Sequence, residues 1–192
     1  ELFKTKGDFE IKPGTVSKKS GKYSFNSFMD AINLANKKEV DAICTLPINK
    51  ESWNKADIRY KGHTEVLRDY FGKHAIMMLG CEKMFVALFN EHIALKKVPK
   101  KINEEDLTKF LIDFYKNVKS ENIAVLGLNP HASDNGVLGD EEVEIFKAIK
   151  KANKYFQKDI FKGPMVPDTV FSPLSRKNFK YCIKQNHRWV GY

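Results

Sequence analysis

Residues 123–142 read IAVLGLNPHASDNGVLGDEE, a pattern typical of a buried strand, a loop and the start of an amphipathic helix. The run from Ile123 to Gly127 is short, apolar and rich in branched residues, as in strands that are covered on both faces. In open α/β sheets, ligands bind at the loops beyond the carboxyl ends of such strands. His131 lies on this loop, directly after Pro130, which stiffens the backbone. The loop is therefore either part of a functional site or an ordinary polar turn.

Apolar strands and amphipathic helices alternate along the chain, which predicts an α/β fold with a largely parallel or mixed sheet. The expected strands are 40–46, 75–79, 85–89 and 123–128, with shorter ones at 8–12 and 169–171, and residues 178–183 form a further, partly apolar segment. The expected helices are 24–37, 48–55, 64–71, 141–156 and a long one after Asn103. Because only five residues separate 75–79 from 85–89, these two strands are expected to pair antiparallel.

Further details of these elements follow from side-chain chemistry. Ser24 and Asn103 are expected to cap the helices that follow them. Gly163 and Pro164 are expected to turn the chain. The residues expected to face the core from helix 141–156 are Val143, Ile145, Phe146, Ile149 and Ala152.

Composition narrows the class of protein. The 192 residues are 42% hydrophobic and 12% aromatic, as in globular domains, and no internal repeat or linker marks a domain boundary. No apolar run approaches the roughly 20 residues needed to cross a bilayer, and no signal-peptide core stands at the start. Cys44, Cys81 and Cys182 are far apart and show no CxxC spacing, so neither a zinc knuckle nor a disulfide framework is expected. A reducing cytoplasm fits this composition best.

The net charge of +9 is compatible with nucleic acid, with a phosphorylated small substrate or with a lysine-rich surface alone. The lysines are scattered, and no basic stripe interleaved with aromatic residues occurs. We therefore expect neither a nucleic-acid nor a membrane partner.

Histidines follow several of the expected strands. His92 follows 85–89, His131 follows 123–128, and His63 lies beyond 40–46 after a short helical insert. If these strands run parallel, the three imidazoles converge at one edge of the sheet, and imidazoles are good ligands for zinc, cobalt or manganese. No short metal motif such as HExxH supports this, so single polar loop residues remain the alternative. His74 precedes a strand and is expected to be structural.

Two further segments have residues suited to anions. Gly62-His63-Thr64-Glu65 opens a helix, where backbone amides and the His63 and Thr64 side chains suit a phosphate; Thr64 as an ordinary cap is the alternative. Lys50 follows a strand end, where it suits phosphate binding or proton transfer, or is a surface lysine. The sequence contains no GxGxxG or Walker motif, and Ser133 has no neighbouring His–Asp arrangement.

A series of motifs then occurs in a characteristic order: TLPINK (45–50), GHTE (62–65), NEHIAL (90–95), LNPHASDNG with GDEE (128–142) and GPMVPDTVF (163–171). Together they resemble the 4-hydroxythreonine-4-phosphate dehydrogenase family of vitamin B6 biosynthesis, over roughly residues 20–187. The resemblance implies a two-domain α/β fold like that of the isocitrate and isopropylmalate dehydrogenases, with a mixed sheet. It also implies a cytoplasmic homodimer whose metal site lies near the subunit interface.

The resemblance further implies a reaction and its site residues. The expected reaction is the NAD-dependent (or NADP-dependent) oxidation and decarboxylation of 4-phosphooxy-L-threonine to 3-amino-2-oxopropyl phosphate, in pyridoxal 5'-phosphate biosynthesis. His63 and Thr64 are implied to bind substrate, while His92, His131 and His187 are implied to hold a divalent metal such as zinc, magnesium or cobalt. The family has a YHDQG-like sequence around the third ligand, whereas this chain has Gln185-Asn186-His187-Arg188-Trp189.

The family pattern also extends past both ends of the sequence. We expect the N-terminal strand region and the C-terminal segment that contacts substrate and cofactor to be absent, so that residues 1–192 form a partial dehydrogenase core. The alternatives are a related dehydrogenase acting on another phosphorylated or cyclic hydroxy acid, a metal-dependent hydrolase, and an inactive fragment.

Overall fold

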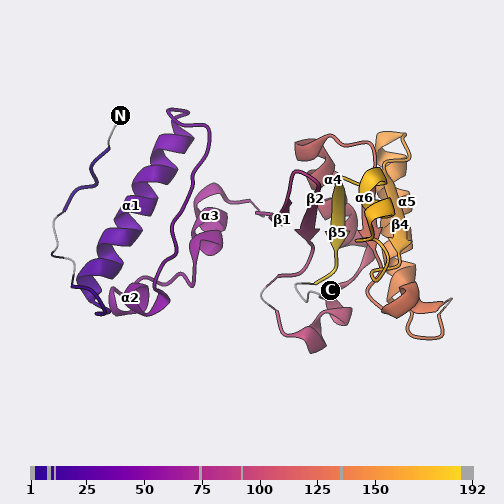
Figure 1. Cartoon of the computed structure of the whole chain (residues 1–192), viewed down its shortest axis with the longest axis horizontal. Helices are drawn as coiled ribbons and strands as arrows, with labels where there is room; N and C mark the ends of the chain where they lie inside the picture. The colour runs from indigo at the N-terminus through magenta and orange to yellow at the C-terminus, as the bar shows by residue number, and fades with distance from the viewer. Residues whose placement is uncertain are drawn as a thin grey trace. The chain divides into compact units, whose positions relative to one another are not determined.

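The computed structural model describes residues 3–7, 10, 12–73, 75–91, 93–134 and 136–186. The chain divides into two compact units, Glu1–Ala75 and Ile76–Tyr192 (Figure 1). No linker composition marks this junction in the sequence. Each unit has a hydrophobic core of its own.

Helices form the regular structure of the described part of unit 1: α1 (Lys18–Asn36), α2 (Lys50–Lys55) and α3 (His63–Phe71). α1 begins six residues earlier than predicted, because Ser17 and Ser20 form a reciprocal capping box. The prediction that Ser24 caps this helix is wrong. α3 ends as predicted at Gly72, which adopts the left-handed conformation. The residues at the centre of this unit are Phe28, Ile32, Trp53 and Val66.

The predicted strand at 40–46 is wrong. Residues 42–49 have no regular structure, and most of their side chains are exposed. A strand is stable only where another strand satisfies its backbone groups, and no described residue of unit 1 forms one. The strand predicted at 8–12 lies largely outside the described residues.

Unit 2 contains a five-stranded mixed sheet in the order β1-β2-β5-β3-β4. The strands are β1 (Met77–Cys81), β2 (Met84–Leu88), β3 (Ile123–Leu126), β4 (Phe161–Met165) and β5 (Tyr181–Lys184). β1 pairs antiparallel with β2, whereas β2, β5, β3 and β4 run parallel to one another. The predicted mixed sheet and the predicted antiparallel pair are both confirmed.

β4 was not predicted, because Gly163 and Pro164 suggest a turn. The strand accommodates both residues because it lies at the edge of the sheet, where a missing backbone donor is tolerated. A side chain at Gly163 would overlap the carbonyl oxygen of Val125 in the neighbouring β3. The strand predicted at 169–171 is wrong, since these residues form a turn before α6 (Pro173–Asn178).

Successive side chains of a strand point to opposite faces of the sheet, so the sheet contributes to two separate hydrophobic cores. On β3, Ile123 and Val125 face α4 (Glu104–Val118) and α5 (Glu141–Phe156), whereas Ala124 and Leu126 face the opposite side. The second side is covered by Val170 and the segment around α6. All four β3 side chains are fully buried, so the prediction of a strand covered on both faces is confirmed.

α5 spans the predicted residues, but its inward face differs from the prediction. Ile145, Ile149 and Ala152 are buried, as predicted. Val143 and Phe146 are about half exposed, at 51% and 45%, so their assignment to the core is wrong. The Phe146 ring instead contacts the ammonium group of Lys150, 4.5 Å from the ring centroid, which is a cation–π geometry.

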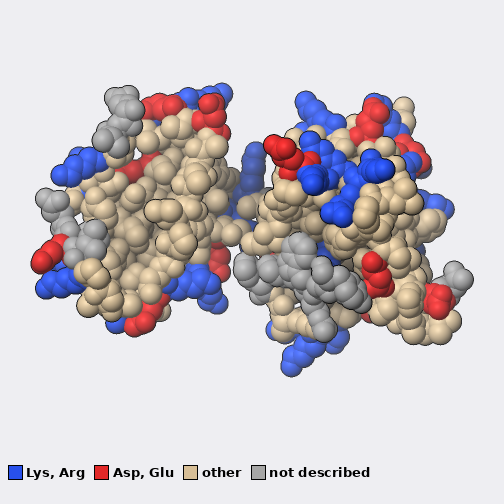
Figure 2. All heavy atoms as spheres, viewed as in Figure 1, with Lys and Arg blue, Asp and Glu red and all other residues tan. Residues whose placement is uncertain are grey.

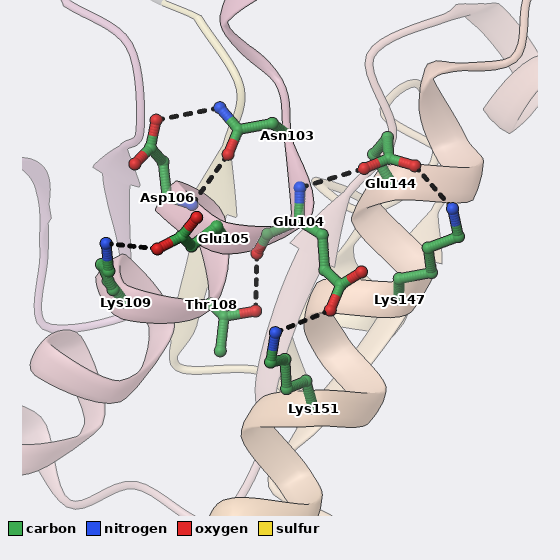
Figure 3. A network of polar contacts seen from close by, with 9 residues as sticks. All are labelled: Asn103, Glu104, Glu105, Asp106, Thr108, Lys109, Glu144, Lys147 and Lys151. Carbon is green, nitrogen blue, oxygen red and sulfur yellow. Dashed lines mark hydrogen bonds and ion pairs between the residues drawn. The ribbon is translucent and has the colours of Figure 1, made fainter.

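Polar contacts at the start of α4 join this helix to α5 (Figure 3). Asn103 accepts a hydrogen bond from the backbone N–H of Asp106, so the predicted cap is confirmed. Glu144 of α5 accepts the backbone N–H of Glu104 at 3.1 Å, and Lys151 of α5 pairs with the Glu104 carboxylate at 2.9 Å. The hydrogen bonds that Glu144 accepts from Lys147 and from the backbone N–H of Glu104 lower the pKa of Glu144. The Glu144 carboxylate is therefore favoured in its ionised form. These contacts hold the N-terminus of α4 against α5.

Charged side chains are mixed over the surface. On the face shown in Figure 2, Lys and Arg lie in several separate groups, with Asp and Glu among them. Within the part of the chain that the structure describes, no helix is long and apolar enough to span a membrane.

Candidate functional site

The carboxyl ends of three neighbouring parallel strands meet at one edge of the unit 2 sheet. β5 lies between β2 and β3. In the sequence, the predicted ligands His92, His187 and His131 follow β2, β5 and β3 respectively. The topology therefore supplies the parallel arrangement predicted for His92 and His131. The prediction that His63 follows a third strand of this sheet is wrong, because residues 42–49 form no strand. Of the three predicted ligands, only His131 belongs to the described residues; His92 and His187 lie outside them. Among the described residues alone, no group of three or more His, Cys, Asp or Glu could hold a metal ion.

Buried amide groups lie at the same edge. Gln185, directly after β5, is 1% exposed and donates from Nε2 to the carbonyl oxygen of Leu126 at the end of β3, at 2.8 Å. Its Oε1 and the Nδ2 of Asn90, which follows β2, are buried without a hydrogen-bond partner among the described residues. Such groups normally have a partner. Their chemistry fits an edge that receives a polar ligand or a metal with its bound water.

The backbone around His131 has an unusual conformation. His131, Ala132, Ser133 and Asp134 all have positive φ, at 53°, 52°, 67° and 49°. Each non-glycine residue in this region costs about 1–2 kcal/mol, and such conformations persist only where surrounding contacts stabilise them. His131 itself is exposed, whereas Ser133, two positions further on, is buried. The loop therefore presents the imidazole at the surface and anchors the residues beside it.

The main anchor is the carboxylate of Glu142, which is 7% exposed. Its Oε1 accepts the backbone N–H groups of Leu128 and Asn129, both at 2.8 Å. Its Oε2 accepts the side-chain amide of Asn129 at 2.8 Å and the hydroxyl of Ser133. Burial by itself raises the pKa of Glu142, but the hydrogen bonds from Ser133 and Asn129 outweigh it and hold the pKa below its usual value. Glu142 is therefore an ionised carboxylate at neutral pH.

Two glycines allow this close packing. A Cβ at Gly127 would lie 3.0 Å from Oε1 of Glu142 and 3.2 Å from the Cα of Ala132. A Cβ at Gly139 would lie 2.6 Å from the amide nitrogen of Asn129, and the φ of +143° at this position already favours glycine. The glycines thus bring the strand end, the loop and the start of α5 into contact.

The predicted substrate-binding residues belong to unit 1. His63 is the first residue of α3 and packs edge-on against Phe28 and Trp53, with ring centroids 4.5 and 5.8 Å away. Thr64 is half-buried beside it, and Gly62 occupies the cap position, so Thr64 as an ordinary cap is wrong. Lys50 is exposed at the start of α2. His63, Thr64 and Lys50 thus belong to unit 1, whereas His131 belongs to unit 2.

An open cavity of about 460 Å³, which was not predicted from the sequence, lies beside α3. Its lining residues are Arg59, Tyr60, Glu65, Arg68 and Asp69. The guanidinium of Arg59 and the hydroxyl of Tyr60 both donate to Asp69, and Glu65 accepts the backbone N–H of Lys61 at 2.7 Å. The signal available in the sequence was the pair of arginines on either side of the GHTE motif.

Acidification is expected to destabilise unit 1 through His63. Burial lowers the pKa of His63 below its ordinary value of 6.5, so the folded protein favours the neutral imidazole. The unfolded chain therefore binds the proton first. This contribution to stability is fully present above about pH 6.5 and is lost as the pH falls through the lowered pKa. Chemical denaturation at several pH values measures the slope, and His63→Gln should remove this component; an unchanged slope would contradict the prediction.

These features define an α/β protein with a candidate ligand site at the carboxyl ends of parallel strands. Residues 2–187 match the protein family described as Pyridoxal phosphate biosynthetic protein PdxA. The chain therefore belongs to the PdxA family, as the ordered motifs indicated.

Individual relatives agree with this assignment. The chain is 54% identical to proteins named 4-hydroxythreonine-4-phosphate dehydrogenase from Sulfurimonas denitrificans and from Campylobacter fetus, and each alignment covers 97% of this chain and 61% of the relative. It therefore spans about three fifths of the length of these relatives. A crystal structure of 4-hydroxythreonine-4-phosphate dehydrogenase from Klebsiella pneumoniae matches with a TM-score of 0.80 at 31% identity, over 92% of this chain and 55% of that one. This match confirms the predicted fold class.

Proposed function

We propose that the chain is the metal-binding part of a dehydrogenase that uses NAD, or NADP, to oxidise and decarboxylate 4-phosphooxy-L-threonine. The observation that carries the proposal is the 54% identity to relatives named 4-hydroxythreonine-4-phosphate dehydrogenase, over nearly the whole chain. The loop that bears His131 supports it, because strand-end loops of this kind are where α/β enzymes bind their ligands.

In this proposal His92, His131 and His187 hold a divalent metal, namely zinc, magnesium or cobalt. The parallel order of β2, β5 and β3 supports the assignment, as do the buried amides of Asn90 and Gln185 at the same edge. A divalent metal bound there supplies positive charge that stabilises negative charge developing on a substrate oxygen.

The remaining assignments concern the substrate. His63 and Thr64 bind it, and the N–H groups at the start of α3 suit its phosphate. The substrate hydroxyl is oxidised to a ketone as hydride passes to the nicotinamide and a proton leaves, and Lys50 is a candidate to accept that proton. The resulting keto acid loses carbon dioxide, its carbon–carbon bond electrons are protonated, and 3-amino-2-oxopropyl phosphate is formed.

We further propose that the protein acts in the cytoplasm as a homodimer, with the metal site near the subunit interface. The mixture of charges on the surface supports a small phosphorylated substrate rather than nucleic acid as the ligand, because no aligned basic stripe is apparent in the sequence.

The direct test follows NADH absorbance after 4-phosphooxy-L-threonine, NAD and a divalent metal are added. Formation of NADH that stops when a chelator removes the metal would support the proposal. Release of phosphate without NADH would indicate a metal-dependent hydrolase instead. Absence of either product, with the folded state verified by circular dichroism, would mean that this chain is an inactive fragment.

A further inference from the structure

We propose that Glu142 is a positioning residue for His131: its carboxylate holds the loop in the conformation that presents the imidazole to a divalent metal. The inference rests on the proposed function, because it takes His131 to be a metal ligand. Glu142 belongs to α5 and not to the loop, so it acts on His131 through the residues it binds.

The contacts of Glu142 flank His131 on both sides. Before the histidine, its carboxylate binds the backbone N–H of Leu128 and both the backbone and the side chain of Asn129. After the histidine, it binds the hydroxyl of Ser133. One buried side chain thus holds Leu128 and Asn129, three and two positions before His131, and Ser133, two positions after it. A displacement of either anchor would move the imidazole relative to the other strand ends.

The loop needs such an anchor because its backbone does not favour the observed conformation. The consecutive positive φ angles from His131 to Asp134 are disfavoured for residues with a Cβ. No glycine relieves the strain within this run. Contacts made by the loop must therefore stabilise it, and Glu142 supplies hydrogen bonds at its start and at its centre.

The chemistry of the anchor requires a carboxylate. All the groups directed at Glu142 are donors: two backbone N–H groups, the Asn129 amide and the Ser133 hydroxyl. An ionised carboxylate is an acceptor only and satisfies all of them. In Glu142→Gln, one oxygen becomes an NH₂ group. Whichever oxygen is replaced, this group faces a donor of Asn129, either its backbone N–H or its side-chain amide. The isosteric change therefore breaks the anchor without removing volume.

The experiment measures the affinity of the 192-residue chain for Co²⁺, by its visible absorption bands, in wild type and in variants. Glu142→Gln is expected to weaken Co²⁺ binding about 10–100-fold and to alter the bands, as found when residues that orient metal ligands are changed. Glu144→Gln is the matched control: it removes the same charge from the same helix and the ion pair with Lys147, while its amide oxygen still accepts the backbone N–H of Glu104. It should lower the stability to denaturant and leave Co²⁺ affinity unchanged.

The outcomes separate the inference from the function on which it rests. If His131→Ala abolishes Co²⁺ binding while Glu142→Gln stays within twofold of wild type, the inference is wrong and the metal site stands. If Glu144→Gln weakens binding as much as Glu142→Gln, the effect reflects general stability and the inference is also wrong. If wild type binds no Co²⁺, or His131→Ala binds as wild type does, the proposed metal site is wrong and the inference falls with it.

Discussion

Replacing His131 by alanine is expected to reduce the affinity of the chain for Zn²⁺ or Co²⁺ by more than about 100-fold. Residues that merely orient a ligand already contribute roughly 10–100-fold to metal affinity, so loss of the ligand itself should exceed this. His131 is exposed, and its side chain is not part of either core of unit 2. The stability of the fold should therefore change little. Metal content after dialysis and a Co²⁺ titration measure the effect.

The same titration tests the other two proposed ligands. His92→Ala and His187→Ala should each cause a loss similar to that of His131→Ala, because three imidazoles share one ion in this assignment. The control is His63→Gln, which changes a histidine assigned to substrate instead of metal. It should bind metal as wild type does. Full metal content in both His92→Ala and His131→Ala would show that the ligand set is wrong.

The sequence predicted elements whose stabilising contacts are local. α5 has a strong helical period and a cluster of acidic residues at its start, and its bounds agree with the prediction. The β1–β2 pair was predicted from a gap too short for a crossover. The strand predicted at 40–46 and the unpredicted β4 show the limit of this reasoning. Whether either segment forms a strand depends on whether another strand pairs with it. The local sequence pattern carries no information about such a partner.

The site shows the same division. The position of His131 after β3 could be predicted, because the apolar run of this buried strand ends at a recognisable point in the sequence. The role of Glu142 could not, because its acidic character suits a helix N-terminus equally well. Only the folded backbone shows that its side chain reaches back to Leu128, fourteen residues earlier in the chain. Gln185 likewise follows an apolar strand, and its bond to Leu126 depends on β5 pairing with β3.

Gly21→Ala is expected to destabilise unit 1 by roughly 1–3 kcal/mol, the usual cost of overpacking a close contact. Gly21 lies in the first turns of α1 and is buried. A Cβ there would overlap the carbonyl oxygen of Ser52 and lie 3.0 Å from the backbone nitrogen of Trp53, both in α2. These are backbone atoms, so no side-chain rotation relieves the overlap, and the two helices must separate.

The higher helix propensity of alanine opposes the overlap in Gly21→Ala, so the sign of the change in stability shows which effect is larger. Alanine favours a helix over glycine by about 1 kcal/mol, so a loose contact would make Gly21→Ala stabilising. We expect overlap to prevail because α1 and α2 are also joined by Trp53, whose fully buried indole donates to Ser24 at 2.9 Å. Separating the helices would open this core. Gly62→Ala is the control, since its Cβ meets open space and its backbone is extended; it loses only the preference of a cap position for glycine over alanine, and should cost less than about 1 kcal/mol. Denaturation followed by tryptophan fluorescence compares the two; equal stability would show that α1 and α2 pack less closely than these distances indicate.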